Sequence, residues 1–241
     1  MKYIITLFMI NLSCFSQTYL ANYIEKPINN ENTFKDLPLE IKIHQEELRN
    51  KIHSYSLVYS NGISFYENTT DETINFRTFD NKKYTSTDDK YFYFNFNKNS
   101  MFFKTRFKKD YLYIEDKPIE FNWEITSDTL TINNTLCKKA KTNWGGFTTY
   151  AWYTESIPIN AGPEKFNGLP GLIFKVQLPA REFTLIGIEK KENITEINNP
   201  KSNQNTISFD ELVRLSDELI NTLKKQNTSS NPNVIIIKKE Q

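Results

Sequence analysis

The chain has 241 residues, of which 38% are hydrophobic, and a formal net charge of +1. A chain of this length can bury roughly 70% of its unfolded surface, so it can fold without disulfides or metal ions. Its near-neutral charge provides no long-range attraction to nucleic acid or to an anionic membrane, which argues against both as partners.

Residues 1–16 have the pattern of a secretory signal peptide. Lys2 precedes an apolar run over residues 4–10, and small residues lie before a cleavage site at Gln17. The run is far shorter than the ~20 residues that a membrane-spanning helix needs. We therefore expect an exported protein without a transmembrane segment, in which residues 17–241 form a single domain.

Two alternatives remain for this segment. It could form a helix buried in the domain, or it could carry a lipid at Cys14, although Asn11 stands where a lipobox needs an aliphatic residue. Cleavage would remove one lysine and no acid, and would leave Cys137 as the one cysteine. The mature protein would then have zero net charge and no intramolecular disulfide, and its stability would come from a hydrophobic core.

The first predicted element after this segment is a helix over residues 39–53, where apolar residues recur at spacings of seven and four. Both histidines, His44 and His53, fall in this range. Their spacing puts them on opposite faces of a helix, where they cannot hold a metal ion together.

From residue 55 to residue 190 the chain is a succession of short runs that alternate between apolar and polar residues, as antiparallel strands do. Asn61 and Gly62 supply the two positive-φ positions of a type I′ hairpin turn. The predicted strands cover residues 55–60, 63–66, 74–79, 91–96, 101–107, 111–115, 119–126, 129–132, 147–154, 172–176 and 183–189.

A second helix is predicted to begin at Ser208, which forms a capping box with Glu211 and precedes an amphipathic stripe. Polar linkers are expected over residues 198–205 and 226–233. Residues 234–237 either close the sheet as a last strand or add to a partner's sheet edge. These elements predict a mainly β (α+β) fold, a curved antiparallel sheet or open half-barrel with one or two helices packed on it.

No catalytic motif stands out in the chain. It contains no Gly-x-Ser-x-Gly elbow, phosphate loop or zinc-protease motif. Lys138 and Lys139 could activate Cys137, but adjacent strand residues point to opposite faces, which favours a buried structural thiol. Paired carboxylates stay open, because 29 acidic residues allow many pairs. We assign no catalytic residue, metal site or cofactor from the sequence.

Aromatic residues gather between Tyr91 and Tyr113, where ten of 23 residues are Phe or Tyr. Both faces of the strand over residues 91–96 are aromatic. One face is expected to line the core. The other, with Tyr91 and Tyr93, meets another part of the protein, a partner, or a ligand such as a sugar, peptide or lipid.

Five of the seven glycines lie between residues 145 and 171, interleaved with three prolines. Glycine is needed where φ is positive or where another group approaches closely, and proline fixes φ, so this segment specifies a backbone shape. Pro170 and Gly171 are predicted to occupy the centre of a type II turn, with a positive φ at Gly171. The turn is either a buried structural corner or a rim that contacts a ligand or partner.

The candidate binding residues are the aromatic residues beside this turn, the turn itself and the two tyrosines of the aromatic strand. They are Trp144, Trp152, Tyr153, Gly168, Leu169, Pro170, Gly171, Tyr91 and Tyr93.

The stretch from Cys137 to Val176 resembles the GLPGLI family, exported proteins from one phylum of bacteria with an outer membrane. The motif that names the family stands here at residues 168–173. Other motifs of the family accompany it in order: Cys-x-Lys-Ala at residues 137–140, Ala-Trp-Tyr-Thr at 151–154, Ile-Pro-Ile at 157–159 and Gly-Pro-x-x-Phe at 162–166. The resemblance implies a periplasmic or outer-membrane-associated protein, and it carries no established activity or site residue.

These observations favour a non-enzymatic accessory protein that binds an outer-membrane protein complex, a lipid or a peptide. A hydrolase of peptide or glycan is the alternative, in which two carboxyl groups share a cleft and one has a raised pKa. A purely structural surface protein would have neither a pocket nor such a pair. The sequence gives no indication of the oligomeric state.

Overall fold

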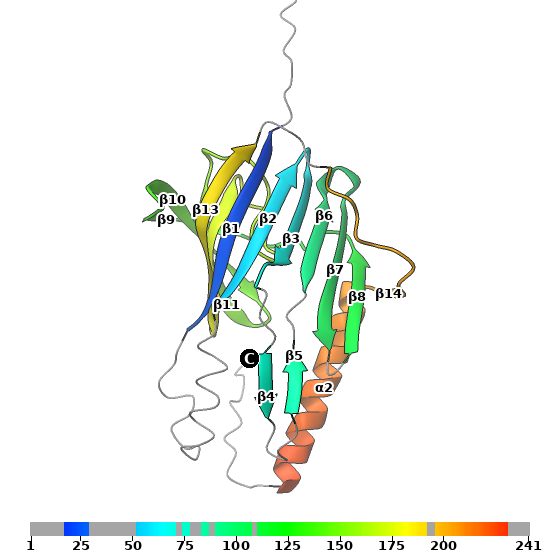
Figure 1. Cartoon of the computed structure of the whole chain (residues 1–241). Helices are drawn as coiled ribbons and strands as arrows, with labels where there is room; N and C mark the ends of the chain where they lie inside the picture. The colour runs from blue at the N-terminus through cyan, green and yellow to red at the C-terminus, as the bar shows by residue number, and fades with distance from the viewer. Residues whose placement is uncertain are drawn as a thin grey trace, which may run out of the picture.

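A computed structural model describes residues 17–28, 52–70, 74–77, 83–86, 90–107, 110–191 and 196–230 (Figure 1). Its elements are β1 (Thr18–Pro27), β2 (His53–Ser60), β3 (Ile63–Asn68), β4 (Ile74–Arg77), β5 (Lys83–Ser86), β6 (Tyr91–Asn95), the 3-10 helix η1 (Phe96–Lys98), β7 (Ser100–Phe107), β8 (Asp110–Asp116), β9 (Glu124–Ile132), β10 (Thr135–Trp144), β11 (Phe147–Thr154), β12 (Leu172–Gln177), β13 (Arg181–Lys191), β14 (Thr206–Ile207) and helix α2 (Phe209–Ser230).

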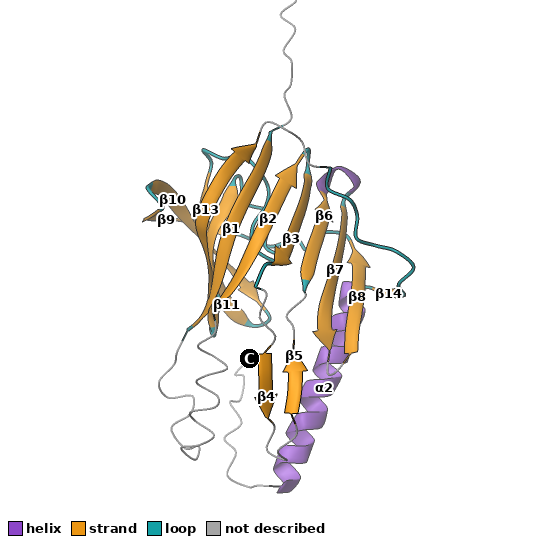
Figure 2. Ribbon diagram, viewed as in Figure 1, coloured by secondary structure: helices purple, strands orange, loops and turns teal. Residues whose placement is uncertain are grey.

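The main sheet has twelve strands in the order β14-β8-β7-β6-β3-β2-β1-β13-β12-β11-β10-β9, and β4 pairs with β5 in a separate sheet. Its neighbouring strands are antiparallel, except for β14 and β8. The sheet curves, with β9, β10 and β11 turning behind the other strands (Figure 2). Its edge strands β14 and β9 are not paired with each other. The predicted fold, an open curved antiparallel sheet with a packed helix, is confirmed.

The predicted hairpin turn between β2 and β3 is also confirmed. Asn61 and Gly62 have φ values of 50° and 74°, as a type I′ turn requires. A second turn of the same hand, which the sequence analysis did not identify, joins β9 to β10 through Asn133 and Asn134, with φ values of 49° and 60°. Asparagine tolerates this conformation better than other non-glycine residues, so it can replace glycine in such a turn.

The strand predicted over residues 119–126 is wrong in its first half, because β9 begins only at Glu124. Ile119, Phe121 and Trp123 do pack against the core, as their alternation suggested. However, hydrogen bonds from side chains hold this segment, and not backbone pairing with a neighbouring strand. The indole Nε1 of Trp123 donates to the Asn167 carbonyl at 2.8 Å, and the Asn167 amide donates to the Ile119 carbonyl at 3.4 Å.

Two long strands of the sheet, β1 and β10, were not predicted. In β10 the apolar pattern is interrupted by Lys138, Lys139 and Lys141. Each of these lysines forms an ion pair with an acidic residue, at distances of 2.8, 3.2 and 3.1 Å respectively. Because these charges stay in contact with solvent, β10 does not need a regular alternation of apolar residues.

Helix α2 begins as predicted, with the Ser208 hydroxyl accepting from the Glu211 amide at 3.2 Å. The reciprocal half of the capping box is not formed, because the Glu211 carboxylate binds Arg214. Asp116 of β8 instead accepts the Phe209 amide at 2.9 Å and ties the helix to the sheet. The helix continues to Ser230, so the linker predicted over residues 226–233 is wrong for its first five residues.

Several predictions fall outside the described residues: the signal peptide over residues 1–16, the position of His44 and the last strand over residues 234–237. The predicted helix over residues 39–53 also lies there except at its end, where His53 is the first residue of β2 and not helical.

The buried apolar side chains form one continuous core in which aromatic rings are prominent. The ring of Tyr55 stacks on that of Tyr66 with centroids 5.0 Å apart, and Phe92 stacks on Phe103 at 4.9 Å. Phe209, the first residue of α2, packs against Phe103 at 6.4 Å. The start of α2 is therefore anchored on the aromatic part of the core, and the pocket described below lies at this contact.

Candidate functional site: a charged pocket beneath helix α2

The connection between β11 and β12 folds back along the sheet and places charged residues next to α2. Its backbone is fixed by hydrogen bonds from the Leu172 amide to the Ile157 carbonyl at 2.9 Å and from the Ile173 amide to the Ala161 carbonyl at 3.0 Å. Glu164, in the middle of the connection, has a φ of 52°. A non-glycine residue keeps this left-handed conformation only where its surroundings hold it there.

The Gly-Leu-Pro-Gly corner ends this connection. Leu169 is buried, and an added Cβ at Gly171 would lie 2.0 Å from the Thr154 carbonyl oxygen. The predicted type II turn is wrong, because the Gly171 amide donates to the Leu169 carbonyl at 2.8 Å, which is a tighter turn centred on Pro170. Gly171 is needed because the end of β11 approaches its backbone so closely. Leu169 and Gly171 are buried, as the structural corner requires, whereas Gly168 and Pro170 are exposed.

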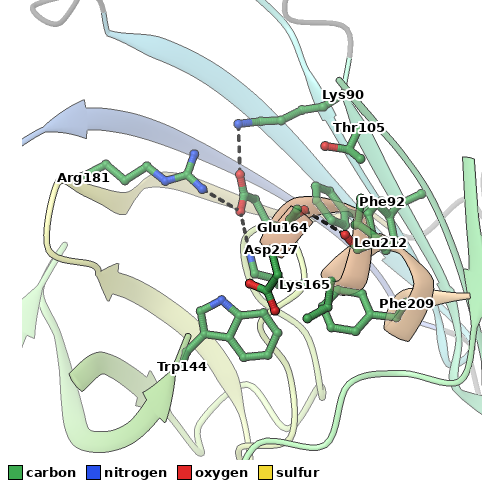
Figure 3. Close-up of a pocket in the computed structure, with 13 residues that line it drawn as sticks. Lys90, Phe92, Thr105, Trp144, Glu164, Lys165, Arg181, Phe209, Leu212 and Asp217 are labelled. Carbon is green, nitrogen blue, oxygen red and sulfur yellow. Dashed lines mark hydrogen bonds and ion pairs between the residues drawn. The ribbon is translucent and has the colours of Figure 1, made fainter. Parts of the chain in front are cut away.

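The β11–β12 connection brings the buried Glu164 into a cluster of charged residues at the floor of a pocket. Glu164, whose side chain is 3% exposed, accepts ion pairs from Lys90 at 2.9 Å, Lys165 at 3.1 Å and Arg181 at 3.4 Å. Glu25 of β1 forms further pairs with Lys90 at 3.2 Å and Arg181 at 3.0 Å. Lys165 therefore shares its one carboxylate partner among the described residues with two other cations (Figure 3).

These charges shift the pKa values of the residues that form the cluster. Burial alone would raise the pKa of Glu164, but the charges of Lys90, Lys165 and Arg181 outweigh it and hold that pKa well below its usual range. Burial would also raise the pKa of Glu25, but the charges of Lys90 and Arg181 outweigh it and lower that pKa. Burial lowers the pKa of Lys165, and the positive charges of Arg181 and Lys90 lower it further, against the opposing effect of Glu164. Both carboxyl groups are thus ionised at neutral pH.

A tyrosine hydroxyl is buried near this cluster. Tyr66 is 1% exposed, and its hydroxyl has no hydrogen-bond partner among the residues that the structure describes. Burial raises its pKa well above the usual value, and the nearby Glu164 and Glu25 carboxylates raise it further. Tyr66 is therefore a neutral phenol, and the positive charge of the cluster comes from Lys90, Lys165 and Arg181.

The pocket itself has a volume of about 350 Å³ and lies between α2, the sheet and the β11–β12 connection. This is near the lower end of the ~300–1,000 Å³ range of small-molecule pockets. Its walls are largely apolar, whereas the charged cluster forms one end. The lining residues are Lys90, Phe92, Phe103, Thr105, Trp144, Glu164, Lys165, Arg181, Phe209, Leu212, Val213, Ser216 and Asp217.

Of the residues predicted for binding, only Trp144 lines this pocket. Trp152 is 9% exposed, with the ammonium groups of Lys139 and Lys175 over its ring at 5.6 and 5.4 Å. Tyr153 is fully buried. These two residues and the turn residues Gly168, Leu169, Pro170 and Gly171 belong to the structural corner.

Tyr91 and Tyr93 lie on the face of β6 opposite the core, as predicted, while Phe92 and Phe94 enter the core. Tyr91 joins a row of rings across neighbouring strands, with Phe65 at 5.8 Å and Phe102 at 6.1 Å. Tyr93 is 5% exposed. This row of rings is therefore on the other side of the sheet from the pocket.

The prediction of a buried structural thiol at Cys137 is confirmed. Cys137 is fully buried, and burial raises its pKa to about 11, so it carries little of the reactive thiolate at neutral pH.

In the described ranges, no three His, Cys, Asp or Glu side chains come together as a metal site. Nor does any helix there have the length and apolar character needed to cross a membrane.

The sequence analysis missed Lys90, Glu164, Lys165, Arg181 and Phe209. One signal was available, since the charged pair Glu164-Lys165 stands between Pro163 and Phe166 in a segment rich in glycine and apolar residues. Lys90 and Arg181 lie far away in the sequence, so only the fold brings them to this pair.

Acid unfolding tests the charge state of Glu164. Because the folded pKa of this carboxyl group lies below the ordinary value of 4.5, its stabilising contribution is complete above about pH 4.5 and is lost as the pH falls through the folded value. Urea unfolding of the wild type and of Glu164→Gln should therefore show a free-energy difference that shrinks from neutral to acidic pH. A difference that stays constant over this range would contradict the assignment.

Comparison with known proteins adds a partial family match and a similarity of fold. A family model described as "Protein of unknown function (Porph_ging)" matches residues 145–175, which include the corner and the Glu164-Lys165 pair. This partial match is consistent with a bacterial family of unknown function. Among curated proteins, none matches the chain significantly.

Two solved structures resemble the chain. One, described as "Structure of PNGF-II in C2 space group", has a TM-score of 0.52 and 14% sequence identity, over 83% of this chain and 32% of that chain. Another, "Structure of PNGF-II in P21 space group", has a TM-score of 0.48 and 16% identity, over 76% of this chain and 29% of that chain. The chain thus spans about a third of the length of the first structure, and at 14% identity that similarity concerns the fold alone.

Proposed function

We propose that the protein is an exported, GLPGLI-type binding protein that holds a small ligand with an anionic group in the pocket beneath α2. The charged end of this pocket carries the proposal. Lys165 and Arg181 line it, and both share the Glu164 carboxylate with a third cation. Such cations can still donate charge-assisted hydrogen bonds to a carboxylate or phosphate.

The environment of these cations strengthens such bonds. The Lys165 side chain is 14% exposed, and the rings of Trp144 and Phe166 lie 5.6 and 4.9 Å from its ammonium group. An anion that enters this low-dielectric site interacts more strongly with the cations than it would in water. Its remaining part would lie against the apolar wall, which includes Phe103 and Leu212. A small ligand with an apolar body, such as a peptide end, fits this pocket better than a lipid with long chains.

The hydrolase alternative lacks support in the described part of the pocket. Glu164 lines the pocket and shares cations with Glu25, and the pKa values of both carboxyl groups are lowered. A general acid for hydrolysis needs a raised pKa. The periplasmic location and an outer-membrane partner belong to the same proposal, and they follow from the GLPGLI resemblance.

Calorimetric titration with 3-phenylpropanoate and with its neutral amide tests the anion site. We expect the carboxylate to bind and the amide to bind much more weakly. Lys165→Met should reduce the affinity for the carboxylate roughly 10–100-fold, as the loss of a charge-assisted hydrogen bond does. Lys165→Arg keeps the charge and should retain most of the affinity.

Lys141→Met is the matched control, since Lys141 pairs with Glu124 on β10 and does not line the pocket. It should bind like the wild type. The proposal fails if the carboxylate and the amide bind equally well, or if both methionine variants bind 3-phenylpropanoate as the wild type does.

A further inference from the structure

A carboxylate on the wall of the pocket forms no ion pair with any residue that the structure describes. Asp217 of α2 lines the pocket and is exposed, and it has no ion pair within 4.0 Å among the described residues. Its helical neighbour Arg214 is already bound on both sides, by Glu211 and by Glu218. Asp217 is therefore available to a positively charged group of a ligand.

Two aromatic rings near this carboxylate also favour a cation. Trp144 and Phe209 both line the pocket, and their ring centroids are 5.8 Å apart. In Figure 3 the Asp217 side chain points into the space bounded by Trp144 and the Glu164-Lys165 pair. The negative face of an aromatic ring attracts an ammonium group, most strongly where water is excluded.

The pocket thus presents charges of both signs. Lys165 and Arg181 are among its cations, and Asp217 forms no ion pair with either of them within 4.0 Å. Apolar side chains, among them Phe92 and Leu212, also line the pocket. A ligand with only a negative charge binds the cations but loses part of its affinity to repulsion by Asp217, and one with only a positive charge is repelled by the cations.

We infer that the ligand is a small zwitterion with an apolar body, namely a hydrophobic amino acid or short peptide with both ends free. Its carboxylate binds Lys165 and Arg181, and its ammonium group binds Asp217. This inference depends on the proposed function, because it adds a second contact to the same anion site. The volume of about 350 Å³ suits a ligand of this size.

Three forms of one dipeptide separate the two contacts. Leucyl-phenylalanine, its N-acetyl derivative and its C-terminal amide are titrated into the full protein by calorimetry. We expect the free dipeptide to bind about tenfold more tightly than the N-acetyl form, because acetylation removes the charge that Asp217 recognises. The C-terminal amide should also bind more weakly than the free dipeptide, because it lacks the carboxylate that Lys165 and Arg181 bind.

Asp217→Asn should abolish the preference for the free dipeptide over its N-acetyl form, and it should not weaken the binding of the N-acetyl form. Asp210→Asn is the matched control on the same helix, since Asp210 does not line the pocket. It should keep the preference. Asp217 is exposed, so its substitution is not expected to prevent folding.

The possible outcomes distinguish the two proposals. If acetylation has no effect and Asp217→Asn changes nothing, the zwitterion is ruled out, while weaker binding of the amide still supports the anion site. If the amide binds as well as the free dipeptide, the anion site itself is ruled out. If none of the three forms binds although 3-phenylpropanoate does, the peptide class is wrong and the anion site stands.

Discussion

Replacing Gly171 with alanine is expected to destabilise the protein by about 3 kcal/mol or more. The new Cβ would lie 2.0 Å from the carbonyl oxygen and 2.6 Å from the carbonyl carbon of Thr154. Both atoms belong to the backbone at the end of β11, so no side-chain rotation can relieve the clash. The φ of 157° at Gly171 is also one that residues with a side chain rarely adopt.

Thermal unfolding measures this effect, with Gly187→Ala as the control. Gly187 lies in β13, and an added Cβ there would meet nothing within 4 Å. For a domain of this size, 3 kcal/mol corresponds to a fall in Tm of roughly 6–12 °C. The control should change the Tm by much less. If both variants melt at the same temperature, the corner tolerates a side chain at position 171. That result would contradict the clash with Thr154.

Replacing Glu164 with glutamine is expected to cost about 3–5 kcal/mol, because it removes a buried charge that three cations share. Lys90 and Arg181 would still pair with Glu25, but all three cations would donate only weaker hydrogen bonds to the neutral amide oxygen at position 164. The effect is much larger than that of a typical surface ion pair. It should also loosen the β11–β12 connection that forms the floor of the pocket.

Glu155→Gln provides the comparison for this variant. Glu155 pairs with Lys138 at 2.8 Å, but both side chains are about half exposed, so solvent replaces the lost interaction. Urea unfolding at neutral pH should show a much smaller change for Glu155→Gln than for Glu164→Gln. A similar change in both would mean that the Glu164 cluster is no more stabilising than an exposed pair.

The sequence was informative where structure depends on neighbouring residues. The turn at Asn61-Gly62 needs positive φ at two adjacent positions, and these two residue types signal it directly. The start of α2 is likewise signalled by Ser208. By contrast, β10 was missed because its lysines interrupt the apolar pattern, and ion pairs with residues outside this strand accommodate them.

The pocket could not be predicted for a different reason. Its floor combines Glu25 and Arg181, which are 156 positions apart, with Lys90 and Glu164 from two other segments. No pattern of neighbouring residues in the sequence can predict that these four side chains come into contact. The aromatic residues of the strand over 91–96 were correctly assigned to two faces, but the pocket is lined by Phe92, on the face that had been assigned only to the core.

The wide sequence separation of Glu25, Lys90, Glu164 and Arg181 has a consequence for how the protein matures. The first of these residues lies on β1 and the last on β13, and these two strands pair with each other near the middle of the sheet. A ligand that needs the cluster cannot be captured by a nascent or partly assembled chain. Ligand occupancy would therefore report that folding has reached completion, and a trapped intermediate without the β1–β13 pairing would be unable to bind.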